Sequence, residues 1–580
     1  MMKKPKKSST SFFNLNFLRV TIFFMLFASL IFGNGIVNEF VADDVPQILE
    51  NTTVQSLKNI YVPFLKDTRS FGENPTLGPS FYRPLPSLVF SLIYAISQKD
   101  VYLYHIIQII LVTINASLVY VLFSSFLKKS LSFLLSFIFL IHPINSEIAY
   151  YIADTQDALF FFFGISALLT LHKFQSKKSI IFSAVLLFFC LLSKESGILF
   201  IFIASFYKLF LKRNNLSQFF TALFLLFSAY FTLRVHAVGL SISASLLKSP
   251  IQKAPFLIRI FNIPEIFFYY VKTFFFPLKL SMSYHWVSYH INSQFIISFF
   301  LDFLCISFFL YIFKKLDHRK SKTSKMYLFF STWFFIGIFF HLHIIALDQT
   351  VAERWFYFSA VGLLGIIGII LENFNFSLRN KWAILIIIII FSLLSFQSFR
   401  RSFDWRDDKT IATHDLKTSA EAYVLEDELT YVYYKESNYL EAKNHALRSI
   451  KIYPNVVNYT NLGVSEFLLG NYKDSEKAYV QALKLGDYNL TYHNLSSLYL
   501  IYGNPKKNVQ FLKHAVKKYP KDSFLFLVLA RLEYFLELKK EAKDDIRHAY
   551  LIDSSSRIKY FYDEMLQDKP LILKRVAEEN

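Results

Sequence analysis

Long apolar segments alternate with short polar loops from residue 17 to residue 398 of this 580-residue chain. In lipid every backbone polar group must be hydrogen-bonded within the protein, so only helices and closed barrels can span a bilayer. Barrel strands show about ten residues of strict alternation, whereas these segments are continuously apolar. We therefore predict an all-α fold class, with a polytopic helical membrane domain over residues 1–400.

We predict about eleven membrane spans in this domain. They are residues 17–37, 101–126, 130–142, 158–172, 179–192, 197–211, 216–235, 293–313, 327–346, 355–371 and 382–398. The apolar stretch 84–98 is too short to cross and is expected to lie in the interface. Lysine and arginine follow alternate spans, for example at Lys128 and Lys129. Because cytoplasmic loops carry the basic excess, the N-terminus is expected in the cytoplasm and everything after residue 400 on the exoplasmic side.

The first apolar run follows Lys3, Lys4, Lys6 and Lys7, which is also the pattern of a cleavable signal peptide. No small-residue cleavage site is evident, so an uncleaved first span is favoured. The formal charge of +19 lies largely in short loops between apolar blocks, where it sets orientation, and we expect no nucleic-acid partner. Both cysteines lie in apolar blocks, so neither a disulfide framework nor a cysteine metal site is predicted.

The second half repeats with a period of 33 to 34 residues over 423–555. One unit contains Asn461-Leu462-Gly463, and the next contains Asn494-Leu495-Ser496. Small residues and prolines recur at matching places, a pattern that resembles the tetratricopeptide repeat. We predict about four repeats forming an α-solenoid, after a linker at 401–422 and before a C-terminal tail at 556–580. Stacking alone and a groove that binds a peptide or protein are equally expected roles.

Charged and polar motifs gather at the predicted outer ends of the spans. The candidate site residues are Asp43, Asp44, Arg83, His142, Glu147, Asp157, Lys194, Glu195, Arg234, Glu353 and Arg354. Ionisable groups at membrane depth are costly, so they usually pair or line a functional cavity. Acids and bases at one face suit an anionic, membrane-borne substrate.

The acids Asp43, Asp44 and Asp157 are the predicted catalytic residues. Inverting glycosyl transfer needs one carboxylate to remove a hydroxyl proton. Acids of this kind also hold a divalent cation, Mg or Mn, on a leaving phosphate. The structural alternative for Asp44 and Asp157 is helix capping.

The bases Arg83, Lys194, Arg234 and Arg354 are candidates for a phosphate clamp. The alternatives are snorkelling to lipid headgroups and internal ion pairs, Lys194 with Glu195 and Glu353 with Arg354. For His142 a helix-end hydrogen bond is favoured over a metal-binding role.

The order of these motifs resembles a known family. Asp43-Asp44, Tyr82-Arg83-Pro84-Leu85, His142-Pro143, Ser193-Lys194-Glu195, Phe276-Pro277-Leu278, Ala352-Glu353-Arg354 and Asp404-Trp405-Arg406-Asp407 appear in sequence before the repeats. This resembles the transmembrane and tetratricopeptide-repeat-containing O-mannosyltransferases, which are membrane glycosyltransferases of the GT-C fold. The family usually has an arginine two positions before the counterpart of Asp157, where this chain has Thr155.

The resemblance implies a sugar donor linked to polyprenyl phosphate and transfer with inversion to a protein hydroxyl or another acceptor. It implies Asp43 or Asp44 as the general base, Asp157 as a positioning acid and the cations as phosphate ligands. The repeat array would hold the acceptor protein or glycan. Two other functions stay open, a non-enzymatic membrane scaffold and a lipid-carrier polysaccharide ligase or flippase. The abundance of Phe, Ile, Lys and Asn favours a bacterial inner membrane as the location.

Overall fold

The computed structural model describes residues 15–68, 80–174, 176–239, 248–317, 322–374 and 380–571. Over these residues the chain is helical, with one isolated β-bridge between Tyr284 and Val351, so the all-α prediction is confirmed there. The chain divides into two compact units, Met1–Ala422 and Tyr423–Asn580. The basic residues before the first helix and residues 572–580 of the predicted tail 556–580 lie outside the described residues.

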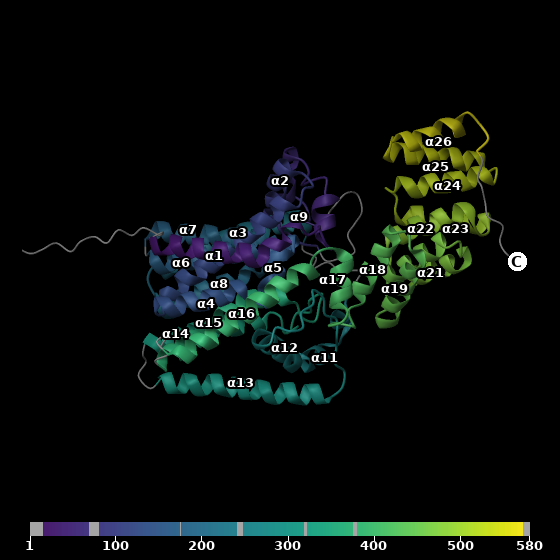
Figure 1. Cartoon of the computed structure of the whole chain (residues 1–580). Coiled ribbons are helices and arrows are strands. Elements are labelled where there is room, and N and C mark those ends of the chain that lie inside the picture. Colours follow the sequence, from purple (N-terminus) through teal and green to yellow (C-terminus); the bar gives the residue numbers. More distant parts are fainter. Residues whose placement is uncertain are drawn as a thin grey trace, which may run out of the picture. The chain divides into compact units, whose positions relative to one another are not determined.

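The first unit is a bundle of long apolar helices (Figure 1). Its helices are α1 (Leu15–Phe32), α2 (Pro84–Ser97), α3 (Tyr102–Ser124), α4 (Lys129–Ile141), α5 (Ser146–Tyr150), α6 (Thr155–Lys173), α7 (Lys177–Ser193), α8 (Ile198–Phe206), α9 (Leu216–Val238), α10 (Pro250–Lys253), α11 (Phe256–Phe261), α12 (Ile263–Phe275), α13 (Ser293–Asp317), α14 (Lys322–Phe339), α15 (Phe356–Asn373), α16 (Lys381–Asp404) and α17 (Asp408–Asp415). Short 3-10 and π turns, labelled η1 to η9, connect them. Residues 401–422, predicted as a linker, belong to this unit as the end of α16, α17 and the turn after it.

The prediction of eleven spans is too high. Within the described residues, seven helical stretches are long and apolar enough to cross a membrane, or eight if α4 and the bent segment after it form one span. Each predicted span overlaps a helix, but α7 has only 17 residues and α8 only 9, and the predicted span 327–346 runs past the end of α14 at Phe339. Helix α14 has two lysines in its first turn, which lowers its mean hydropathy. A multi-pass membrane protein is nevertheless the class that these helices support.

Two ends of the bundle differ in chemistry. At one end lie the junctions α3–α4 and α6–α7 and the C-terminal end of α13, which carry lysines. At the other end lie the C-termini of α1, α4, α7 and α16 and the N-termini of α6 and α15, joined by polar contacts. The candidate site residues fall at this second end.

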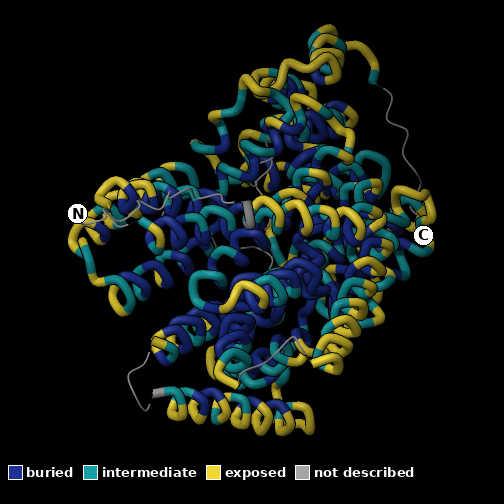
Figure 2. The backbone as a smooth tube through the Cα atoms, turned by 60° about the vertical axis from the view of Figure 1, so that its left-hand side comes forward, coloured by how far each residue is buried: buried dark blue, intermediate teal, exposed yellow. Residues whose placement is uncertain are grey.

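The core of the first unit is dominated by aromatic side chains. Trp333, Phe330 and Phe334 of α14 are fully buried against α15. A Cβ on Gly362 would lie 2.4 Å from the backbone N of Phe334, so glycine is what allows these two helices to approach. By contrast α13 and α16 bury few of their residues, as the exposed side of α13 at the bottom of Figure 2 shows. Their outward apolar faces suit contact with lipid.

The second unit consists of four helix pairs and one further helix. The pairs are α18 (Tyr423–Lys435) with α19 (Tyr439–Ile452), α20 (Val456–Leu468) with α21 (Tyr472–Leu485), α22 (Asn489–Ile501) with α23 (Pro505–Lys518), and α24 (Ser523–Phe535) with α25 (Lys539–Ile552), followed by α26 (Ser556–Leu566). Each pair turns at a residue with positive φ: Ser437, Gly470, Gly503 and Glu537. Their spacing confirms the period of 33 to 34 residues.

Candidate functional site

One bent segment supplies most of the acids of the site. Helix α4 ends at Ile141, and the chain then bends by 55° at His142 and Pro143. Proline lacks a backbone N–H and cannot continue a helix from the preceding turn. The chain passes through two short turns and α5 before α6 begins at Thr155. The bend keeps residues 142–157 at one end of the bundle rather than along its length.

The central ion pair joins this segment to α15. Arg354, in the 3-10 turn before α15, places Nη1 2.5 Å from Oε1 of Glu147. Its backbone N–H also donates to Oε2 of Glu147 at 2.9 Å. The Glu147 side chain is 1% exposed and that of Arg354 is 14% exposed, so the arginine side chain is still partly accessible. The pair fixes the relative position of two segments 207 residues apart.

Asp154 lies beside this pair. It was not among the predicted catalytic or substrate-binding residues. Its side chain is 1% exposed, and its Oδ1 is 3.8 Å from Nε of Arg354. Within the described part of the chain neither carboxylate oxygen has a hydrogen-bond donor. The sequence signal that could have identified it is an acid at the N-terminus of an apolar helix.

A second ion pair lies one turn further along α6. Nζ of Lys194 is 2.7 Å from each carboxylate oxygen of Asp157, and both side chains are buried, at 8% and 2% exposure. The prediction that Lys194 pairs with its neighbour Glu195 is therefore wrong. Lys194 follows the end of α7, where the chain becomes extended and turns its side chain into the bundle.

Glu195 pairs instead with Arg83. Nε of Arg83 is 2.7 Å from Oε2 of Glu195, and its Nη1 donates to the side-chain oxygen of Gln156 at 2.6 Å. Arg234 of α9 is half-buried and lies, with Arg83 and Glu195, within electrostatic range of Tyr230. Snorkelling thus does not describe Arg83, Lys194 or Arg354, each of which is held by a carboxylate.

The two acids after α1 differ in environment. The Asp43 side chain is exposed, while Asp44 is fully buried. The Asp44 carboxylate accepts the backbone N–H of Ala153 at 2.6 Å and that of Val41 at 3.2 Å. Burial raises the pKa of Asp44 well above its ordinary value, against the effect of these hydrogen bonds. Asp44 therefore ties its loop to the bent segment, and Asp43 is the acid that a substrate can reach.

Tyr151 lies where these groups meet. Its hydroxyl accepts the backbone N–H of Asp43 at 2.9 Å, and its ring stacks on Trp405 with centroids 5.3 Å apart. The charges of Asp43, Asp44, Asp154 and Arg354 all act on its phenol. The structure therefore brings the acids after α1 to the same place as Arg354, with the pair of Asp157 and Lys194 one helical turn away.

His142 makes the helix-end hydrogen bond that the sequence favours. Its Nδ1 accepts the backbone N–H of Ile144, and its Nε2 lies 2.8 Å from the carbonyl oxygen of Phe274. The imidazole also stacks on the Phe274 ring, with centroids 4.7 Å apart. These contacts fasten the end of α12 to the bent segment.

Glu353 belongs to a neighbouring network and not to an ion pair with Arg354. Its Oε1 accepts the backbone N–H of Ser281 at 2.6 Å. The next backbone N–H, that of Met282, donates to Asp415 of α17 at 2.7 Å. Two carboxylates from distant segments therefore hold the chain at residues 281 and 282.

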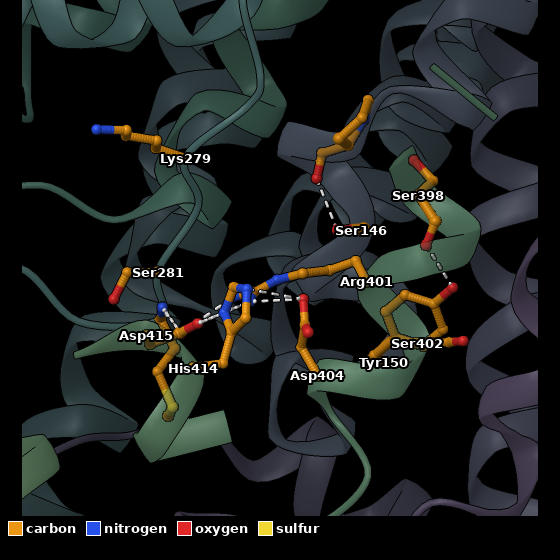
Figure 3. A network of polar contacts seen from close by, with 12 residues as sticks. Ser146, Tyr150, Lys279, Ser281, Ser398, Arg401, Ser402, Asp404, His414 and Asp415 are labelled. Carbon is orange, nitrogen blue, oxygen red and sulfur yellow. Dashed lines mark hydrogen bonds and ion pairs between the residues drawn. The ribbon is translucent and has the colours of Figure 1, made fainter. Parts of the chain in front are cut away.

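Arg401 anchors that network, which sequence reasoning missed (Figure 3). Its two terminal nitrogens lie 2.7 and 3.0 Å from the carboxylate oxygens of Asp415, and both side chains are almost completely buried. Burial raises the pKa of Asp415, but Arg401 and a hydrogen bond from His414 outweigh it and hold the pKa below its ordinary value. An arginine at the end of an apolar helix, with acids within the next 14 residues, is the signal that the sequence offered.

The predicted divalent cation has no preformed ligand set in the part of the chain that the structure describes. No group of three or more His, Cys, Asp or Glu side chains there is arranged to hold a metal ion. Asp44, Glu147, Asp157, Glu195 and Glu353 are engaged with arginine, lysine or backbone N–H groups, and Asp154 lies beside Arg354.

No protein-family model matches the chain. It is 26% identical over 207 residues to the mouse protein O-mannosyl-transferase TMTC3, a match that covers 35% of this chain and 22% of that protein. The human TMTC3 is 25% identical over a stretch of the same length. The Caenorhabditis elegans protein O-mannosyl-transferase F38B6.6 is 28% identical over 171 residues, 29% of this chain and 24% of that protein.

Among solved structures, a chain from the crystal structure of the APC/C hetero-tetramer Cut9-Hcn1 covers 83% of this chain and 90% of its own length, at 13% identity and a TM-score of 0.25. That score is too low to bear on the fold. The matched stretch spans less than a quarter of each curated relative. Over about a third of its length, the chain is thus similar to proteins named protein O-mannosyl-transferases.

Proposed function

We propose that this chain is a membrane glycosyltransferase of the GT-C type that moves a sugar from a polyprenyl-phosphate carrier to a hydroxyl group of a protein or another acceptor. The observation that carries the proposal is the exposed carboxylate of Asp43 beside a buried set of paired acids and bases. The names of the relatives point to the same chemistry.

Asp43 is the general base in this scheme. Its carboxylate takes the proton of the acceptor hydroxyl while that oxygen attacks the anomeric carbon of the sugar. The bond between that carbon and the carrier phosphate breaks, and its electron pair leaves with the phosphate. A single displacement of this kind inverts the anomeric configuration.

Arg354 is placed to stabilise the leaving phosphate. Charge develops on the phosphate oxygens as the bond breaks, and a preorganised cation in a water-poor site stabilises that charge. Glu147 holds the guanidinium, so the accessible part of the Arg354 side chain meets the substrate in a fixed orientation. The pair of Asp157 and Lys194 and the pair of Arg83 and Glu195 support this arrangement as positioning groups.

The location of the site follows from charge. The basic end of the bundle belongs in the cytoplasm by the positive-inside rule, so the site end faces the exoplasmic side. The abundance of Phe, Ile, Lys and Asn favours a bacterial inner membrane as the location. The second unit, a tetratricopeptide-like array, would hold the acceptor protein or glycan.

The test is product analysis with the full chain in lipid nanodiscs. A polyprenyl-phosphate mannose labelled in the sugar is supplied with a serine- and threonine-containing protein acceptor. We expect labelled acceptor, free polyprenyl phosphate in equal amount, and the opposite anomeric configuration in the product. Unchanged carrier after prolonged incubation with several sugars would contradict the proposal and favour a scaffold, while transport of intact carrier would indicate a flippase.

A further inference from the structure

The loop that follows α12 exposes an apolar tip. Phe275, Phe276 and Leu278 are 54%, 67% and 71% exposed, and Lys279, next to them, is also exposed. Pro277 and Leu280 are buried between and behind them. Three large apolar groups beside one ammonium form an amphipathic surface, which we call the 275–279 tip.

Both ends of this tip are fastened to the candidate site. On one side His142 binds the carbonyl oxygen of Phe274 and stacks on its ring. On the other side the backbone N–H groups of Ser281 and Met282 donate to Glu353 and Asp415. A surface that served only to touch bulk lipid would not require two such anchors. The tip is therefore held in a fixed position relative to Arg354, the neighbour of Glu353.

The balance of charge at the site indicates what the tip binds. Among the candidate cations, Arg83, Lys194 and Arg354 each face a carboxylate at 2.7 Å or less. These pairs offset part of the positive charge that a phosphate monoester or diester needs, so a further cation would add to the stabilisation that Arg354 provides. In the described residues the Lys279 ammonium has no hydrogen bond or ion pair, and Figure 3 shows its side chain extended away from the network around Arg401.

We propose that the 275–279 tip binds the lipid-phosphate portion of the donor. The Lys279 ammonium takes the phosphate, and Phe275, Phe276 and Leu278 take the first units of the prenyl chain. The inference rests on the proposed function and adds to it a recognition site for the carrier. Charge complementarity and the attachment of the tip to Glu353 favour the carrier over bulk phospholipid as the occupant.

The test measures binding and does not need turnover. Radiolabelled farnesyl phosphate is titrated against the full chain in phosphatidylcholine nanodiscs, for wild type, Lys279→Gln, Lys279→Arg and Phe276→Ser. Lys99→Gln is the matched control, because Lys99 is an exposed lysine in the turn after α2. Loss of a charge-assisted contact predicts binding weaker by about 10- to 100-fold in Lys279→Gln. We expect a change of less than about 3-fold in Lys279→Arg, which keeps the charge, and no change in Lys99→Gln. Phe276→Ser should weaken the binding of farnesyl phosphate while leaving competition by inorganic phosphate unaltered.

Three results would overturn the inference: equal binding by wild type and Lys279→Gln, no binding of farnesyl phosphate by wild type, or equally effective competition by phosphatidylglycerol. The last result would identify the tip as a general anionic-lipid contact. Failure of the proposed function is separable, because a wild type that binds farnesyl phosphate at the tip but transfers no sugar contradicts only the activity. Normal sugar transfer with unaltered binding of farnesyl phosphate in Lys279→Gln contradicts only the proposal that the 275–279 tip binds the carrier.

Discussion

The two units of this chain treat buried charge differently. In the first unit, some acids are matched with bases from distant segments, as Glu147 is with Arg354 across 207 residues and Glu195 with Arg83 across 112 residues. In the second unit, pairs such as His445 with Glu426 and His493 with Asp522 join helices 19 and 29 residues apart. The repeat pairs follow from packing the helices of one pair or of neighbouring pairs. The long-range pairs of the first unit form only when segments far apart in the sequence have come together.

This difference indicates which charges are structural and which serve a site. Replacing a buried ion pair by apolar groups often costs nothing in stability, so retention of several such pairs at one bundle end requires another reason. Under the proposed function, holding Arg354 in a fixed orientation near the acids that follow α1 is such a reason. In the repeats the ion pairs join helices that are close in sequence. Among the described residues of the second unit, no group of charges from distant segments comes together as it does in the first unit.

The largest expected effect comes from removing one partner of a buried pair in the first unit. Asp157→Ala leaves the Lys194 ammonium buried without a counter-charge, and we expect a loss of about 3–5 kcal/mol in the free energy of unfolding. Denaturant unfolding of the full chain in detergent micelles measures this loss. The matched control is Asp474→Ala in α21, whose pair with Lys477 is exposed and should contribute less than about 1 kcal/mol. Equal losses of unfolding free energy in the two variants would contradict the claim that the two units differ in how they use charged pairs.

A close approach in the repeats gives the next effect. A Cβ on Gly463 would lie 2.4 Å from the Tyr479 ring, so Gly463→Ala must displace that buried side chain, at a cost of about 1–3 kcal/mol. Hydrogen exchange of the α20 and α21 amides should accelerate accordingly. Gly486→Ala is the control, because its Cβ would meet Val456 at an ordinary 3.6 Å. Similar exchange rates in both variants would show that the Tyr479 side chain can move aside without destabilising α20 and α21.

Sequence reasoning succeeded where the signal is periodic and local. The apolar segments 101–126 and 382–398 lie on helices, and the repeat period appears in the positive-φ residues of the second unit. It failed where burial and the choice of ion-pair partner decide the structure. The chain is extended at Lys194, so the side chains of Lys194 and Glu195 point in different directions and bind different partners. It also gave no means to separate Asp43 from Asp44, since a single step along a turn decides which carboxylate is buried.

A pH dependence is expected in the second unit. Burial raises the pKa of Glu533 to about 7, with Asp545 adding to the rise and Lys513 opposing it. Because the folded pKa exceeds the unfolded one, the contribution to stability is full below about pH 4.5 and is lost as pH rises through about 7. We expect α24 amide protection to fall by about 1–2 kcal/mol between pH 5 and pH 8. Glu533→Gln should flatten this profile, and an unchanged slope in that variant would assign the dependence to other groups.

The smallest effect concerns backbone strain at the repeat turns. Glu537 has a φ of +61° where two other repeats use Gly470 and Gly503. Glu537→Gly relieves a left-handed conformation that costs a non-glycine residue about 1 kcal/mol, against the added entropy of the unfolded chain. We expect a net gain of about 0.5 kcal/mol or less in α24 and α25 protection. Marked destabilisation would show that the Glu537 side chain holds the turn.

The central claim is that Asp43, the exposed acid over the paired network, is the base, and that Asp44 is structural. It is tested most directly by comparing the rate of sugar transfer in Asp43→Asn and Asp44→Asn at equal amounts of folded protein, determined by thermal unfolding. The account predicts that Asp43→Asn lowers the rate about 10²- to 10⁴-fold with unaltered unfolding. It predicts that Asp44→Asn lowers stability but leaves the rate per folded molecule unchanged. Full activity in Asp43→Asn would contradict it.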